Sequence, residues 1–95
     1  MFLVLLTYKK SLADIEKALA DHVVFLDKYY ENKKLIFSGR RNPRTGGIIL
    51  VNSDNKEEVV KIMQQDPFYQ QGLADYEFIE FTPTKCDEGF RQFLT

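Results

Sequence analysis

The chain repeats one pattern of apolar spacing twice, and this repetition limits its fold more than any other feature. A strand-like run of aromatic, branched and leucine residues at 2–8 precedes a helical pattern, and a second strand-like run covers 34–38. The same order returns with a third strand at 48–51, a second helical pattern and a fourth strand at 75–81. The predicted element order is therefore β-α-β-β-α-β.

Residues that start and stop helices bound both helical segments. Ser11 offers an N-cap for the first helix, which is expected to end near Asn32. Ser53 or Asp54 caps the second helix, and Pro67 ends it. The element order predicts a ferredoxin-like α+β fold, with a four-stranded antiparallel sheet and two helices on one face. The first helix carries one apolar stripe made of Leu12, Ile15, Leu19, His22, Leu26 and Tyr29.

The strands at 2–6 and 48–51 are apolar on both faces, which points to a partner. Two helices can cover only one face of the sheet, and a sheet with one solvated face alternates apolar and polar residues. We therefore expect the second face to pack against the same face of a second copy, across a two-fold axis. The alternative is that the C-terminal tail, 85–95, folds back over part of this face.

Length and composition indicate one globular domain over residues 1–95, with a core at about 1–84 and the tail at 85–95. A formal net charge of -1 gives no field that attracts nucleic acid or an anionic membrane. The third strand lacks the aromatic and basic residues of RNA-recognition domains. No signal-peptide pattern or membrane-spanning run is present, so we expect a cytoplasmic protein without nucleic-acid or membrane partners.

Few side chains of this chain are suited to chemistry, and His22 is the first candidate. One His and one Cys fall short of a four-ligand zinc site, and the lone Cys86 cannot form an internal disulfide, so no metal or cofactor is expected. His22 lies on the apolar stripe of the first helix and could act as a general acid/base. A half-buried structural histidine is the more common case in an arbitrary domain.

A catalytic histidine needs a partner, usually a carboxylate, that fixes its tautomer. Asp21 is adjacent in sequence but points to another side of the helix. Asp66 ends the second helix, which should pack beside the first, so it is the better candidate. An aspartate that forms a turn before proline is the alternative interpretation.

Three arginines, Arg40, Arg41 and Arg44, lie in the loop between the second and third strands. A solvated basic loop is the common case. If the loop borders a cleft, the guanidinium groups suit an anionic substrate such as a carboxylate.

The sequence resembles the YciI-like family of small dimeric α+β-barrel proteins, over nearly the whole chain to about Thr84. The resemblance rests on these motifs: His22 in the middle of the first helix, Ser38-Gly39 after the second strand, residues 43–50, Asp66-Pro67-Phe68, and the final strand with residues 80–84.

The resemblance implies a ferredoxin-like monomer that pairs into a barrel, and a pocket where His22 and Asp66 form a dyad beside Ser38 and Gly39. A related dehydrochlorinase and the muconolactone isomerases of the wider superfamily imply lyase or isomerase chemistry on small cyclic acids. This chain has Gly39-Arg40 where such sequences often have Gly-Pro, so its ligand preference is expected to differ.

Two functions stay open at this point. In the first, an enzyme without metal or organic cofactor, His22 moves a proton at a carbon activated by a carbonyl or carboxylate. Asp66 orients the imidazole, and the arginines hold an anionic group of a small-molecule substrate. In the second, the protein is a non-catalytic ligand-binding or interaction module. A homodimer is expected in both cases, and a higher oligomer is compatible with either.

Overall fold

A computed structural model describes residues 1–94, and Thr95 of the predicted tail lies outside the described residues. The elements, in chain order, are β1 (Phe2–Tyr8), α1 (Leu12–Glu31), β2 (Leu35–Arg40), β3 (Gly46–Val51), α2 (Lys56–Met63), α3 (Pro67–Gln70), β4 (Ala74–Glu80) and the 3₁₀ helix η1 (Glu88–Phe93). The strands form one four-stranded antiparallel sheet in the order β2-β3-β1-β4. The predicted ferredoxin-like α+β fold is confirmed.

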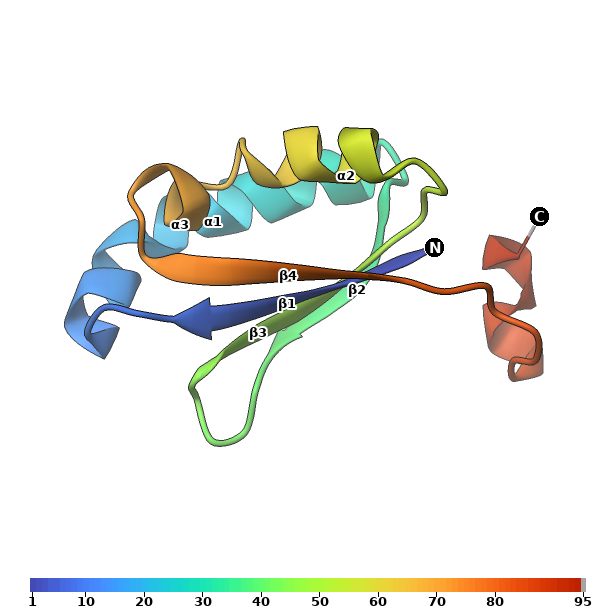
Figure 1. Cartoon of the computed structure of the whole chain (residues 1–95), viewed down its shortest axis with the longest axis horizontal. Helices are drawn as coiled ribbons and strands as arrows, with labels where there is room; N and C mark the ends of the chain where they lie inside the picture. The colour runs from blue at the N-terminus through green and yellow to red at the C-terminus, as the bar shows by residue number, and fades with distance from the viewer. Residues whose placement is uncertain (95) are drawn as a thin grey trace.

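All three α-helices cover the same face of the sheet (Figure 1). The core lies between these layers, and the alternation along β1 sends Phe2, Val4 and Leu6 into it. Opposite Val4, the neighbouring strands place Ile49 and Phe78 on the same side. The helices contribute Ile15, Ala18 and Phe25 from α1, Val59, Ile62 and Met63 from α2, and Phe68 from α3. No helix in residues 1–94 is long and apolar enough to cross a membrane.

Local chemistry sets the helix boundaries, with two differences from the predictions. Ser11 caps α1 as expected, and its hydroxyl accepts the backbone N–H of Asp14. The cap of α2 is Asn55, because its side chain accepts the N–H of Glu58. The second helix also ends at Met63, before Pro67, and Pro67 instead begins the separate helix α3.

The apolar stripe predicted on α1 is only partly buried. Leu12 and Leu19 keep 45% and 37% of their surface exposed, whereas Phe25, absent from the predicted stripe, is buried. Leu12 occupies the first position of the helix, and Leu19 faces an open cavity instead of the sheet.

The second face of the sheet, here called the outer face, carries no helix (Figure 1). Six apolar side chains lie on it, Leu3, Leu5, Phe37, Ile48, Leu50 and Ile79, and of these only Leu50 is buried within the monomer. Phe37 is 49% exposed and Ile79 40% exposed. The helix η1 lies beyond one end of the sheet, so residues 85–94 do not fold back over this face. This differs from the alternative prediction, in which the C-terminal tail covers part of the face.

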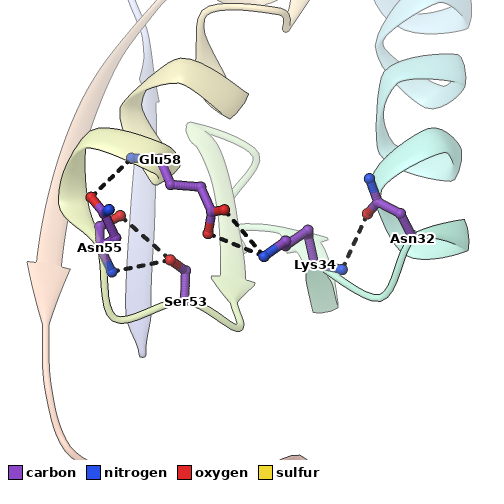
Figure 2. A network of polar contacts seen from close by, with 5 residues as sticks. All are labelled: Asn32, Lys34, Ser53, Asn55 and Glu58. Carbon is purple, nitrogen blue, oxygen red and sulfur yellow. Dashed lines mark hydrogen bonds and ion pairs between the residues drawn. The ribbon is translucent and has the colours of Figure 1, made fainter.

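A polar network ties the start of β2 to α2 (Figure 2). The ammonium of Lys34 lies 3.2 Å from both carboxylate oxygens of Glu58. Ser53 and Asn55 bond to each other in the turn that begins α2. The Ser53 hydroxyl and then the Lys34 ammonium hold the pKa of Glu58 below its ordinary value.

We expect Glu58→Gln to destabilise the fold in a pH-dependent way. A carboxyl with a lowered pKa in the folded state contributes stability above its unfolded pKa, here near 4.5, and loses it as the pH falls through the folded value. Both side chains are partly exposed, so the free energy of unfolding should fall by no more than about 1 kcal/mol at neutral pH.

Urea unfolding of both proteins at neutral and acid pH measures this difference. The control is Glu57→Gln, because Glu57 precedes Glu58 on α2 and has no ion pair within the described chain. A loss that is the same at both pH values would contradict the assigned role of the carboxylate.

Candidate active site

His22 and Asp66 come together where α1 passes α3. Nδ1 of His22 lies 2.8 Å from Oδ1 of Asp66, and the two side chains are 12% and 0% exposed. The structure thus juxtaposes the two residues that the sequence proposed as a dyad. Asp21, the other candidate carboxylate, is exposed on α1.

Asp66 is held in place by the start of helix α3. It has extended backbone angles, as the residue before a proline prefers, and it is the N-cap of α3. Its Oδ1 accepts the backbone N–H of Phe68 at 3.0 Å as well as the bond from His22. Its Oδ2 accepts the hydroxyl of Tyr76 from β4 at 2.5 Å. Both oxygens of this fully buried carboxylate therefore have donors, as a buried charge requires.

The hydroxyl of Tyr76 donates a hydrogen bond to the Asp66 carboxylate. Its burial first, and then the nearby Asp66 charge and their hydrogen bond, raise the pKa of Tyr76 far above its ordinary value. The hydroxyl is therefore protonated at neutral pH. Sequence reasoning did not select Tyr76, although it lies on the core-facing side of β4, where a tyrosine hydroxyl needs a buried partner.

The His22 ring is fixed in one orientation. It stacks on Phe68 with the ring centroids 4.0 Å apart and the planes 3° from parallel. Because a carboxylate only accepts hydrogen bonds, the neutral imidazole carries its proton on Nδ1. Nε2 then has a free lone pair, has no hydrogen-bond partner among residues 1–94, and is not one of the buried unpaired atoms.

His22 forms part of the wall of a cavity of about 210 Å³ between α1 and the β2–β3 hairpin. Most of the lining is apolar, as is usual in sites that bind small molecules. Ser38 lies in the wall with its Oγ 2.7 Å from the hydroxyl of Tyr30, and Gly39 lies beside it. The apolar side chains of the lining include those of Leu6, Leu19, Val23, Leu26, Ile49 and Phe68.

The three loop arginines take different positions. Arg40 and Arg44 line the cavity, whereas Arg41 is not part of its lining. The guanidinium of Arg41 is instead 3.5 Å from the hydroxyl of Thr7 at the surface. Five of the predicted site residues thus surround one cavity and Asp66 lies directly behind it. In the part of the chain that is described, no three His, Cys, Asp or Glu side chains form a metal-binding group.

Comparisons with known proteins agree with this fold. A family model, "YCII-related domain", matches residues 1–82. The "Uncharacterized protein YjpA" of Bacillus subtilis (strain 168) is 30% identical over 60 residues, which cover 63% of this chain and 71% of that protein. A solved structure of 5-chloro-2-hydroxyhydroquinone dehydrochlorinase from Burkholderia phenoliruptrix AC1100, in complex with 2,5-dihydroxybenzoquinone, is similar with a TM-score of 0.71. This match covers 85% of this chain and 93% of the other at 18% identity, so it concerns the fold alone.

We expect nitrogen-15 NMR of the imidazole to find the neutral His22 ring protonated on Nδ1. His22 is the only histidine, so its signals need no assignment. In Asp66→Asn the preference for this tautomer should weaken, because an amide can donate as well as accept at the same position. Asp21→Asn, a change beside His22 in sequence but on the exposed surface, should leave the tautomer unchanged. An unaltered tautomer in Asp66→Asn would rule out the carboxylate as the orienting group.

Proposed function

The chain belongs to the YCII-related domain family, and from this premise we propose that it is an enzyme of lyase or isomerase type. Its substrate is a small anionic molecule, with cyclic acids as the leading class. One observation carries the proposal: Nδ1 of His22 is bonded at 2.8 Å to a fully buried carboxylate, while the same ring lines a cavity.

The proposed step is a proton transfer by His22. Nε2 accepts a proton from a carbon next to a carbonyl or carboxylate, and the electron pair of the C–H bond moves into the neighbouring carbonyl group. Asp66 stabilises the imidazolium that forms, as the carboxylate does in other histidine-based sites. Return of the proton to another carbon gives an isomerase, and loss of a leaving group from the adjacent carbon gives a lyase. A positioned acid/base of this kind contributes about 10²–10⁴-fold to the rate.

The shape and charge of the cavity support the substrate class. The apolar wall suits a ring, and Arg40 and Arg44 suit a negatively charged substituent. The dehydrochlorinase of similar fold was solved with a cyclic ligand, 2,5-dihydroxybenzoquinone. The alternative, a non-catalytic ligand-binding module, uses the same cavity without turnover.

A panel of hydroxy- and chloro-substituted cyclic acids tests the enzyme proposal. We expect the wild type to convert at least one member, and His22→Asn to lower kcat by about 10²–10⁴-fold while it stays folded. Asp21→Asn is the matched control and should keep full activity. Thermal stabilisation by a ligand, without turnover of any member, would favour the binding module and contradict the enzyme.

We also propose that two copies pair through the outer face. The face is continuous across the sheet, because Leu3 lies opposite both Leu50 and Ile79. Exposed apolar patches of this kind mark interaction surfaces, and a two-fold axis lets one patch cover its own copy. Burial of Phe37 and Ile79 would remove the largest exposed apolar side chains of this face from water.

Leu5→Glu should therefore convert a dimer into a monomer, because it places a charge in the centre of the outer face. Analytical ultracentrifugation gives the mass and also detects a higher oligomer. Val24→Glu is the control, since Val24 is an apolar residue on α1 that is 67% exposed and distant from this face. A wild type that sediments as a monomer at about 100 µM would contradict the dimer.

A further inference from the structure

One position on the helix-covered face of the sheet, Gly47 in β3, has no side chain. Gly47 lies opposite Leu6 of β1 and opposite Arg40 of β2 in the antiparallel registers. Residues that lie opposite each other in antiparallel strands project from the same side of the sheet, so Gly47 shares the face on which Leu6 is buried. A side chain is therefore missing from the middle of a row in which both neighbours carry long ones.

The space over Gly47 belongs to the cavity beside His22. Gly47, Leu6 and Arg40 all line this cavity on the sheet side, and His22 lines it from α1. Within residues 1–94, and apart from the chain neighbours of Gly47, a Cβ added there would meet one heavy atom within 4 Å, the carbonyl oxygen of Gly39 at 3.1 Å. Because no side chain of α1 or of the adjacent strands comes that close, the missing side chain leaves open cavity space.

The backbone does not require glycine at this position. Gly47 lies outside the left-handed region of backbone angles, and a small shift of the Gly39 carbonyl accommodates a Cβ. The preceding Gly46 is different, because its Cβ would overlap the backbone oxygen of Leu6. Glycine weakens a strand, and where the backbone does not need it, it often marks the close approach of a ligand.

We propose that Gly47 is a specificity-determining residue, which makes room for the ring of a cyclic substrate against the bare backbone of β3. The cavity holds only about 210 Å³, so a ring that fills it leaves no space for an added side chain. A ring held there lies on the sheet side of the cavity, across from the helix that carries His22. The inference rests on the proposed function, because it concerns the same cavity, and it adds the residue that admits the ring.

Benzoate and propionate test this inference, since each carries one carboxylate and only benzoate carries a ring. Titrations followed through the His22 imidazole signals give the dissociation constants and place the ligand beside His22. We expect Gly47→Ala to weaken benzoate binding at least about tenfold, because overfilling a closely packed space is costly. The affinity for propionate, which leaves the space over Gly47 empty, should change by less than about twofold.

Gly47→Val separates the effect on cavity space from any effect on folding. Valine is favoured in strands, and its two further methyl groups extend away from the sheet, so benzoate should bind more weakly still while thermal unfolding shows a folded protein. If valine prevents folding, Gly47→Ala alone decides the test. An alanine variant that does not fold would itself contradict the inference, because Gly47 would then be a requirement of the backbone.

Gly89→Ala is the matched control. It makes the same chemical change in η1, outside the cavity lining, where an added Cβ meets the Asp87 carboxylate at an ordinary 3.6 Å. We expect this variant to keep the wild-type affinity for both ligands. Unchanged benzoate affinity in Gly47→Ala would overturn the inference, as would an equal loss for propionate. A wild type that binds benzoate no more tightly than propionate would also overturn it, because the ring would then gain nothing in the cavity.

This binding test is separate from the test of catalysis. If Gly47→Ala excludes benzoate but no cyclic acid is turned over by the wild type, the role of Gly47 stands and the enzyme proposal fails. If His22→Asn abolishes turnover while Gly47→Ala binds benzoate as the wild type does, the enzyme stands and this inference fails.

Discussion

The buried carboxylate of Asp66 is the constraint on which the site depends. A charge that is fully removed from water is tolerated only when donors surround it, and removal of a partner from such a group costs about 3–5 kcal/mol. Here the donors are His22 from α1, the backbone of Phe68 in α3 and Tyr76 from β4. One carboxylate thereby fixes the relative positions of two helices and an edge strand.

Two residues at the start of α3, Pro67 and Phe68, hold the Asp66 carboxylate and the His22 ring in position. Pro67 fixes the backbone at the start of α3, and this turns the Asp66 side chain toward the first N–H groups of the helix. The backbone N–H of Phe68 donates a hydrogen bond to Asp66, and the Phe68 ring stacks on the His22 ring. The residues at the start of α3 therefore orient the His22 imidazole.

Much of the fold was predictable because it follows from local rules. Alternation and apolar runs located all four strands, and the Ser11 cap located the start of α1. His22 was predictable because a polar residue on an apolar stripe is conspicuous, and the Asp-Pro-Phe motif supplied its partner. Tyr76 was not, since its bond to Asp66 joins an edge strand to a helix cap and leaves no local pattern. Nor does sequence show that Arg44 reaches Glu16 while Arg41 of the same loop turns to Thr7.

The cavity is built from two parts of the chain, which are connected by side-chain bonds such as Tyr30–Ser38 and Glu16–Arg44. The hydrogen-bonded side chains of His22, Asp66 and Tyr76 belong to α1, the start of α3 and β4, whereas Ser38, Arg40 and Arg44 belong to the β2–β3 hairpin on the opposite wall. Substitutions in the hairpin can therefore alter which molecules are recognised while the histidine and its carboxylate keep their geometry. In a fold arranged in this way, the residues that contact a ligand can change from one protein to another while the histidine–carboxylate pair is retained.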